Sequence, residues 1–303
     1  MKNFLSINDC SVEQLKRLLS DSVELKKLYK SGNRDLCLCG KTLAMLFEKP
    51  SLRTRISFQV AMIDLGGSAI YVKPEDIGGI GKREPVKDMA RVLSRYVNGI
   101  MARTFEHSTI VDLAKFATVP VINALTDLSH PCQAMADILT ISEHCGQLEG
   151  IKIAFIGDGN NVARSLALAC AKLDMKMIIA TPAGYKLDIE SIQKINQISA
   201  DCIIQTDDPV ESVVDADIIY TDTWVSMGQE NEKQERIKSF KGFQLNAELL
   251  KSAPADVKIM HCLPAYRGFE ITDEVAESSN SIMFDQAENR LHFQRALLKE
   301  LLS

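Results

Sequence analysis

Long apolar runs are missing from the sequence. No stretch approaches the roughly 18 consecutive apolar residues of a membrane span. The N-terminal segment MKNFLSINDCSVEQLKRLL has no uninterrupted apolar core of signal-peptide length. We therefore expect a cytoplasmic protein that does not associate with membranes.

An excess of positive charge is also missing. The 303 residues include 35 Lys and Arg against 40 Asp and Glu, which gives a formal net charge of -5. Such a chain has no global positive field that would recruit nucleic acid. Any anionic ligand must therefore be bound by a local group of side chains.

The cysteines lack the pattern of a disulfide framework or a zinc site. There are eight of them, none in a C-x-x-C pair, and most lie in apolar segments. In such segments cysteine packs as a small hydrophobic residue. We expect reduced thiols, no bound metal and no cofactor.

What the sequence does contain is a repeated alternation of short apolar runs and longer amphipathic segments. Hydrophobic residues make up 46% of the chain and charged residues 25%, the balance of a folded globular protein. The alternation is typical of α/β units. We predict an α/β fold with two doubly wound parallel-sheet domains joined by interdomain helices. The first covers residues 1–135 and is completed by a C-terminal helix at 287–303, and the second covers 136–286.

The candidate site residues are those that follow each apolar run, because ligands of open parallel sheets bind outside the carboxyl ends of the strands. The runs that we expect to form strands lie at residues 42–47, 68–72, 99–103 and 119–123 in the first half, and at 152–157, 176–182, 201–206, 215–224, 257–264 and 281–284 in the second.

The stretch FEKPSLRTRISFQ, at residues 47–59, places arginines where a helix least favours them. Ser51 is a suitable N-cap, but Thr54 occupies the position of the glutamate that completes a capping box. Free backbone N–H groups, two hydroxyls and the guanidinium of Arg53 then gather at the positive end of the helix. This combination predicts a phosphate site. The alternative is that Arg53 and Arg55 are solvated surface charges.

Three further residues extend this interpretation. Arg103 ends the run GIMAR and offers a second guanidinium to the same anion. His130 precedes Pro131, the expected first residue of a helix, so the helix dipole disfavours its imidazolium form. A neutral His130 can donate a hydrogen bond to a carbonyl, and a structural N-cap is the alternative. Arg290, near the start of the last predicted helix, is either a third anion ligand or an exposed charge.

In the second half, the loop GDGNN at residues 157–161 resembles a dinucleotide-binding loop. Val162 replaces the third glycine of that motif. The next strand ends at Thr181 and Pro182, where an acidic residue would hold a ribose. The sequence thus gives little support for a nicotinamide cofactor, and Asn161 at the helix start is a candidate carboxylate ligand.

Two more strand ends carry polar or reactive side chains. Asp222 is a candidate partner for an ammonium group, with an Asx turn as the alternative. The loop that follows, through Ser226-Met227-Gly228, is a candidate lid. Cys262 is adjacent to His261, and neighbouring strand residues point to opposite faces. We therefore interpret Cys262 as a pocket wall rather than a nucleophile.

Four short motifs together resemble the ornithine carbamoyltransferases. They are S-L-R-T-R at residues 51–55, H-P-C-Q at 130–133, D-T-W-V-S-M-G at 222–228 and H-C-L-P at 261–264. They occur in the order of that family and span nearly the whole chain. The first two are shared with aspartate carbamoyltransferases and imply carbamoyl phosphate, while the last two are more selective for ornithine.

The resemblance implies transfer of a carbamoyl group from carbamoyl phosphate to the δ-amine of L-ornithine, which gives L-citrulline and phosphate, in a homotrimer with active sites at subunit interfaces. The implied catalytic residues are Arg103, His130, Asp222 and Cys262. The implied carbamoyl phosphate ligands are Ser51, Leu52 through its backbone, Arg53, Thr54, Arg103, His130, Gln133, Cys262, Leu263 and Arg290. The implied ornithine ligands are Asn161, Asp222, Ser226 and Met227.

Three positions depart from the usual pattern of that family. Leu52 replaces the usual threonine, which matters little if only its backbone is used. Gly79 stands where many members have a glutamine that reaches the active site of a neighbouring subunit, and Gln59 stands where glutamate is usual. Putrescine, aspartate or an acylated ornithine are alternative acceptors. A nicotinamide-dependent oxidoreductase and a non-catalytic binding protein are the rival interpretations from other classes.

Overall fold

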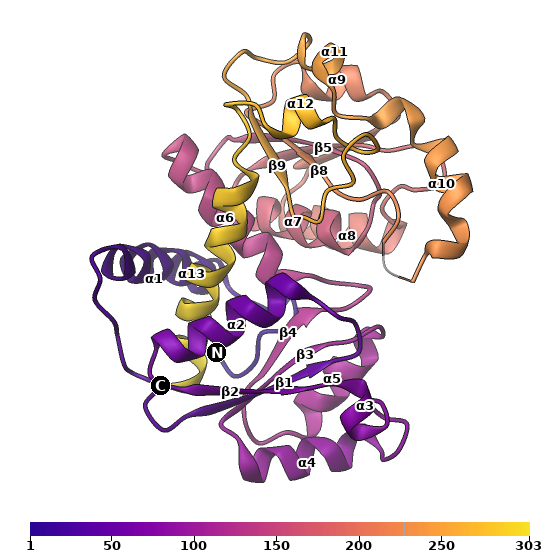
Figure 1. Cartoon of the computed structure of the whole chain (residues 1–303). Coiled ribbons are helices and arrows are strands. Elements are labelled where there is room, and N and C mark those ends of the chain that lie inside the picture. The colour runs from indigo at the N-terminus through magenta and orange to yellow at the C-terminus, as the bar shows by residue number, and fades with distance from the viewer. Residues whose placement is uncertain (227) are drawn as a thin grey trace. The chain divides into compact units, whose positions relative to one another are not determined.

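The computed structural model describes residues 1–226 and 228–303, and the chain divides into two compact units. Unit 1 comprises Met1–Leu139 and Glu288–Ser303, and unit 2 comprises Thr140–Ala287. The chain passes from one unit to the other inside two helices, α6 (Pro131–Cys145) and α13 (Met283–Leu302) (Figure 1).

Unit 1 is built on a four-stranded parallel sheet with strand order β2-β1-β3-β4. Figure 1 shows α2 on one face of this sheet and α4 and α5 on the other. The inner strands β1 and β3 are buried almost throughout, as expected for a parallel sheet covered on both faces. The elements before α6 are α1 (Val12–Lys30), β1 (Thr42–Phe47), α2 (Leu52–Asp64), β2 (Ser68–Val72), α3 (Pro74–Ile77), α4 (Val86–Tyr96), β3 (Gly99–Arg103), α5 (His107–Phe116) and β4 (Val121–Leu125).

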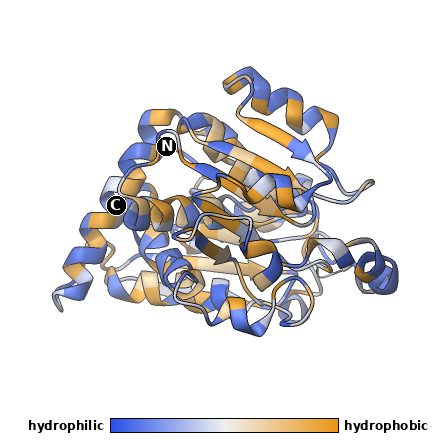
Figure 2. Ribbon diagram, turned by 90° about the horizontal axis from the view of Figure 1, so that it is seen from above, coloured by the Kyte–Doolittle hydropathy of each residue, from blue (hydrophilic) through white to orange (hydrophobic). Residues whose placement is uncertain are grey.

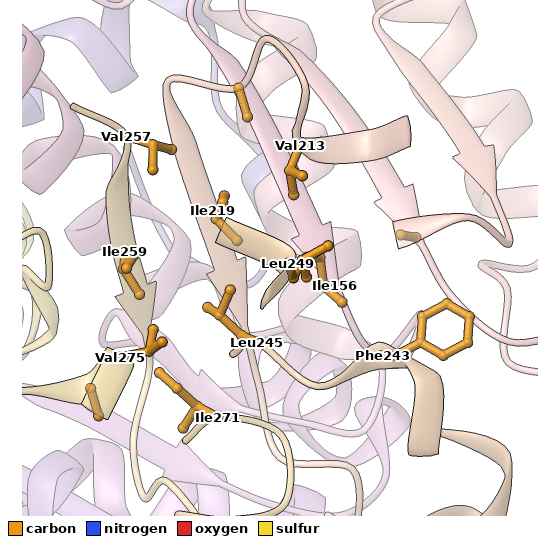
Figure 3. Packing of buried hydrophobic residues seen from close by; sticks show 14 of the residues in the cluster. Ile156, Val213, Ile219, Phe243, Leu245, Leu249, Val257, Ile259, Ile271 and Val275 are labelled. Carbon is orange, nitrogen blue, oxygen red and sulfur yellow. The ribbon is translucent and has the colours of Figure 1, made fainter. Parts of the chain in front are cut away.

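Unit 2 is built on a five-stranded parallel sheet with strand order β7-β6-β5-β8-β9. One hydrophobic cluster lies against β5, β8 and β9, where Ile156, Ile219 and Ile259 pack with residues from α9, α11 and α12 and from the segments between them (Figure 3). The elements are β5 (Lys152–Ile156), α7 (Asn161–Lys172), β6 (Lys176–Ala180), α8 (Ile189–Ile198), β7 (Ile203–Thr206), α9 (Pro209–Val213), β8 (Ile218–Thr221), α10 (Lys233–Ser239), α11 (Ala247–Leu250), β9 (Lys258–His261) and α12 (Asp273–Ala276).

Local sequence explains where the longer helices begin. Ser11 caps α1 with a full capping box, Ser51 caps α2, Asn160 caps α7 and Asp188 caps α8. Each cap satisfies backbone N–H groups that have no partner inside the helix. Hydrophobic residues gather on the strands and alternate with hydrophilic ones along the helices (Figure 2). None of the helices in the described part of the chain combines the length and apolar character needed to cross a bilayer.

The predicted fold class, α/β with two parallel sheets, is confirmed. One predicted strand is wrong. The run SIMF at residues 281–284 makes a single bridge, between Ser281 and Ile259 of β9, and then enters α13 at Met283. Ile282 donates its backbone N–H to Ile259 at 2.9 Å, and both Ile282 and Met283 are buried. The run is apolar because it enters the hydrophobic core at the start of α13.

Candidate active site

The first turn of α2 has the geometry that its sequence predicts. Ser51 has an extended backbone, and its hydroxyl accepts a hydrogen bond from the backbone N–H of Thr54 at 3.3 Å. Thr54 is fully buried, whereas the side chain of Leu52 is 74% exposed. The guanidinium of Arg55 lies over the ring of Tyr71, 4.1 Å from its centroid. Arg55 is thus held against Tyr71 of strand β2 by a cation–π contact. Arg53 belongs instead to the arginines that act on His130.

Arg290 joins this helix start to α6. Its guanidinium donates to the hydroxyl of Thr54 at 3.0 Å and to the side-chain oxygen of Gln133 at 2.7 Å. Gln133 in turn donates to the carboxylate of Asp137 at 2.8 Å. All four side chains are buried. The alternative that Arg290 is an exposed helix charge is therefore wrong, and Gln133 holds the guanidinium in place.

His130 is buried directly before the first residue of α6, Pro131. The pKa of its imidazole is held well below 6.5, first by burial and then by the positive charges of Arg290, Arg103 and Arg53. The predicted neutral state is supported, but burial is a larger cause than any single charge. Because the charges that act on His130 come from three arginines, this region has a strongly positive potential that favours an anion.

Arg103 and one further cation, Lys49, stand at or just after the carboxyl ends of strands in unit 1. Arg103 is the last residue of β3 and is only 7% exposed, and its backbone oxygen accepts from the N–H of Glu48 at 2.8 Å. Lys49, which the sequence analysis did not select, is 5% exposed and pairs with Asp127 at 2.6 Å. Its ammonium also lies 4.1 Å from the ring centroid of Phe105. The sequence could have pointed to Lys49, because this residue lies between the end of strand β1 and the N-cap Ser51.

In unit 2, Asp222 receives hydrogen bonds from two other segments. The thiol of Cys262 donates to its Oδ1 at 2.9 Å, and the amide of Asn160 donates to its Oδ2 at 2.8 Å. Oδ1 also accepts from the backbone N–H of Thr223 at 2.8 Å. Asp222 is 5% exposed. The contact with Thr223 runs to the next residue, whereas an Asx turn bonds the backbone two residues on. The carboxylate is oriented by Cys262 and Asn160, which lie on other segments.

His261 directly precedes Cys262 and is fully buried. The expectation that the two side chains point to opposite faces is wrong, because a ring nitrogen of His261 lies within 4.8 Å of the Cys262 thiol. Its Nδ1 accepts from the backbone N–H of Leu263 at 2.8 Å, so its Nε2 carries the proton and faces the Glu270 carboxylate at 3.1 Å. The donor of this bond, Leu263, itself has a left-handed backbone with φ of 57°. His261 and Glu270 thus fix the turn that presents Cys262, and the sequence analysis missed this role although the motif contained the histidine.

Asp222, His261 and Cys262 also bring three potential metal ligands together, with ligand atoms within 4.8 Å of one another. Each of these side chains already has a defined hydrogen-bond role within unit 2. A neutral His261 with both ring nitrogens engaged has no lone pair left for a metal. We therefore describe the group as a hydrogen-bond network.

The glycine-rich loop after β5 is occupied by the protein itself. A Cβ at Gly159 would lie 2.5 Å from the backbone nitrogen of Leu187 and 2.7 Å from the oxygen of Tyr185. Asp158 forms a buried ion pair with Arg236 of α10 at 2.8 Å. In a dinucleotide loop, the second glycine normally lets a pyrophosphate approach its backbone closely. Here the segment Tyr185–Leu187 of the chain itself lies against Gly159.

The remaining predicted ligands lie at two segment ends in unit 2. Asn161 is the first residue of α7 and is half-buried, and the cap itself is Asn160, which accepts from the N–H groups of Val162 and Ala163. Ser226 is half-buried and donates its backbone N–H to the side chain of Gln229 at 3.0 Å. Met227 lies outside the described residues.

These features define a class of protein: a two-domain α/β protein with a group of arginines near the strand ends of one parallel sheet and a buried carboxylate at the strand ends of the other.

The chain belongs to the aspartate/ornithine carbamoyltransferase family. Residues 2–143 match its carbamoyl-P binding domain and residues 149–301 match its Asp/Orn binding domain. The chain is 51% identical to an ornithine carbamoyltransferase of Anoxybacillus flavithermus, over 99% of this chain and 96% of that one. It is 50% identical to an anabolic ornithine carbamoyltransferase of Pyrococcus furiosus, over 98% and 95% of the two chains.

Solved structures agree with this assignment. The fold is similar to that of ornithine carbamoyltransferase from Pyrococcus furiosus, with a TM-score of 0.96 at 49% identity, covering 99% of this chain and 97% of that one. The enzyme from Thermus thermophilus gives a TM-score of 0.90 at 43% identity, covering 100% and 99%. The resemblance inferred from the four motifs is confirmed.

Proposed function

We propose that the chain transfers the carbamoyl group of carbamoyl phosphate to the δ-amine of L-ornithine, releasing L-citrulline and phosphate. The observation that carries this proposal is the group around His130, a neutral imidazole under the influence of three arginines. The membership of the family and the names of its full-length relatives support the same reaction. The alternative class, a nicotinamide-dependent oxidoreductase, is disfavoured by the filled Gly159 loop.

The phosphate of the donor binds at the start of α2. The ligands are the hydroxyls of Ser51 and Thr54, the backbone N–H of Leu52, and the guanidinium groups of Arg53 and Arg103. Helix N–H groups and forked guanidinium bonds both suit phosphate oxygens. The exposure of the Leu52 side chain supports a role for its backbone alone.

The carbamoyl end of the donor is bound by His130 and Arg290, with Gln133 orienting the guanidinium and with Cys262 and Leu263 as further contacts. Attack on the carbonyl carbon puts negative charge on its oxygen. A neutral His130 donates a hydrogen bond to that oxygen without losing its proton, and Arg103 and Thr54 add further donors. Loss of one such donor typically costs about 2.7–4 kcal/mol of transition-state stabilisation.

Ornithine is held by Asn161, Asp222, Ser226 and Met227. Its δ-ammonium first loses one proton to solvent, because the amine must be neutral to attack. The new C–N bond then forms, the C–O bond to phosphate breaks, and the leaving phosphate takes up the second proton that the nitrogen loses. Asp222 is the anion placed to orient this amine, with Cys262 beside it. Aspartate as acceptor would need a cationic receptor at the same place, which Asp222 opposes.

A carbamoylation assay with a panel of acceptors tests the proposed function. With carbamoyl phosphate, L-ornithine is expected to give citrulline at a rate far above the rates with putrescine, L-aspartate or N-acetylornithine. If another compound of the panel is carbamoylated faster than ornithine, that compound is the acceptor. If none is carbamoylated, a non-catalytic protein is favoured. Fluorescence titration with NADH, expected to show no binding, addresses the oxidoreductase directly.

The setting of the reaction is part of the proposal. We assign the chain to arginine biosynthesis in the cytoplasm, supported by a relative named as anabolic, and to a homotrimer with active sites at subunit interfaces. Sedimentation of the purified protein is expected to give three times the chain mass of 33.6 kDa. A monomer that forms citrulline at full rate would contradict the assembly.

A further inference from the structure

The side chain of Asn160 makes one more contact than a helix cap needs. Its Oδ1 accepts from the backbone N–H groups of Val162 and Ala163 at 2.9 and 3.1 Å, which completes the cap of α7. Its Nδ2 takes no part in the cap and donates to Oδ2 of Asp222 at 2.8 Å. Aspartate caps a helix as well as asparagine does. Capping alone therefore does not require the amide nitrogen, whereas the bond to Asp222 does.

The orientation of the Asn160 amide is fixed at both ends. A flipped amide would turn its NH2 group toward two backbone N–H groups and its oxygen toward a carboxylate, and both contacts would be repulsive. Asn160 is half-buried and Asp222 is 5% exposed, so the bond between them forms where water competes weakly. The end of β8 is thus tied to the start of α7 in one defined geometry.

The bond to Asn160 also determines which part of Asp222 remains for a ligand. A carboxylate offers about four acceptor positions, two on each oxygen. Oδ1 accepts from the thiol of Cys262 at 2.9 Å and from the backbone N–H of Thr223 at 2.8 Å, so both of its positions are used. Among the described residues, Oδ2 accepts from Asn160 alone. One acceptor position is left, and it lies on the oxygen that Asn160 holds.

We propose that Asn160 is a positioning residue for carbamoyl transfer, which holds Asp222 so that Oδ2 accepts a hydrogen bond from the δ-amine of the acceptor. This inference rests on the proposed function, because it takes ornithine as the second substrate. The next residue, Asn161, is a proposed ligand of the same substrate. The start of α7 therefore acts on ornithine twice, directly through Asn161 and indirectly through Asp222.

The variant Asn160→Ser separates positioning from capping. Serine keeps an oxygen for the cap but is too short to reach Asp222 as a donor. We expect kcat/KM for ornithine to fall about tenfold or more, while KM for carbamoyl phosphate changes less than about twofold. Asn246→Ser is the matched control, because Asn246 caps α11 in the same unit and accepts from Leu249 at 3.0 Å. Its kinetics should equal those of the unmodified protein.

The variant Asn160→Asp should give a pH signature that loss of a cap would not. Two carboxyl groups that face each other share one proton, which raises one pKa of the pair. The protonated pair restores a hydrogen bond to Asp222, and the doubly ionised pair repels. The activity of Asn160→Asp relative to the unmodified protein should therefore rise severalfold as the pH falls from about 8 to about 5.5, and that of Asn160→Ser should not.

Other charged or titratable groups near the pair are the same in all of these proteins, and the comparison cancels their effects. They are Asp158 with Arg236 and Glu232 beside it, His261 and Cys262. Unchanged kcat/KM for ornithine in Asn160→Ser, or a relative activity of Asn160→Asp that does not vary with pH, would overturn the inference.

Urea unfolding gives a readout that needs no turnover. Because the pKa of the shared proton is raised in the folded chain, Asn160→Asp should lose stability relative to Asn160→Ser as the pH rises above about 4. Parallel stability curves would show that the side chains at positions 160 and 222 are not coupled, which also contradicts the inference. Failure of the unmodified protein to form citrulline would reject the proposed function, whereas failure of the inference alone leaves that activity intact.

Discussion

The thiol of Cys262 donates a hydrogen bond to Oδ1 of Asp222 across the ends of two neighbouring parallel strands, at 2.9 Å. The register places Thr221 opposite His261, so the next residues of β8 and β9 meet at the carboxyl edge of the sheet. The thiol is therefore a hydrogen-bond donor to a carboxylate. Cys262 orients Asp222 in this account and forms no covalent intermediate.

Substitutions at Cys262 test this role. Cys262→Ser keeps a donor of similar size and is expected to retain most of the activity, whereas Cys262→Ala removes the bond. Because hydrogen bonds to charged groups contribute about 1.5–3 kcal/mol, Cys262→Ala should lower kcat/KM for ornithine by roughly tenfold to a hundredfold. Steady-state kinetics in both substrates provides the measurement. Equal inactivity of the two variants would instead indicate a nucleophilic thiol.

The buried neutral state of His130 makes stability depend on pH. Its pKa in the folded chain is lowered from 6.5, so on acidification the unfolded chain takes up this proton first. The unfolding free energy should then fall below about pH 6.5, by up to about 1.4 kcal/mol per pH unit from this group, and be unaffected above it. Urea unfolding at a series of pH values measures the slope.

The control for that prediction is His130→Gln. Burial also lowers the pKa values of His107 and His292, and these groups contribute equally in both proteins. The variant should therefore show a shallower decline of stability between about pH 6.5 and pH 5 than the unmodified chain. Parallel curves for the two proteins would show that His130 is not buried in its neutral form.

Gly79 occupies a backbone conformation that explains the absence of a side chain there. Its φ is 89°, and a Cβ would lie 2.9 Å from Cδ of Lys82. Gly79→Gln should therefore destabilise the fold by about 1–2 kcal/mol without lowering KM for carbamoyl phosphate. Gly79→Asn is the control, because asparagine tolerates positive φ better. A Gly79→Gln variant with full stability and tighter carbamoyl phosphate binding would show that the loop accommodates the glutamine usual in the family.

The ion pair between Asp158 and Arg236 holds α10 against the loop after β5. The two side chains are buried, and Arg236 also donates to the carbonyl of Trp224 at 3.2 Å. Arg236→Met leaves a carboxylate buried without its partner, which should cost about 3–5 kcal/mol of unfolding free energy. Adding Asp158→Asn to that variant should recover part of the loss. Additive losses in the double variant would show that the pair is not coupled.

Local features of the site could be predicted from the sequence. Ser51 is a cap because of its residue type and its position before a helix. The strand ends followed from the alternation of apolar runs, since a parallel sheet brings those ends to one edge. Asp222 and Cys262 were selected in this way without knowledge that their side chains touch. Each of these predictions depended only on residue types within a few positions along the chain.

Long-range contacts could not be predicted in the same way. Arg290 reaches Thr54, 236 positions away, and Gln133, 157 positions away, and no local pattern distinguishes it from an exposed helix charge. Glu270 was missed because its partner His261 lies on another segment. The run at residues 281–284 was misassigned because short apolar runs have the same appearance in a buried strand and at a buried helix start.

Arg53→Ala, compared with Arg55→Ala, tests the central claim most directly. Both remove a guanidinium from the first turn of α2, but Arg55 lies on Tyr71 while Arg53 acts on His130. We predict that Arg53→Ala lowers kcat/KM for carbamoyl phosphate by a hundredfold or more, roughly the loss of one charge-stabilising donor, and abolishes phosphate binding in calorimetry, whereas Arg55→Ala changes both by less than about tenfold. Unchanged carbamoyl phosphate kinetics in a folded Arg53→Ala protein would contradict the assignment of this helix start as the phosphate site.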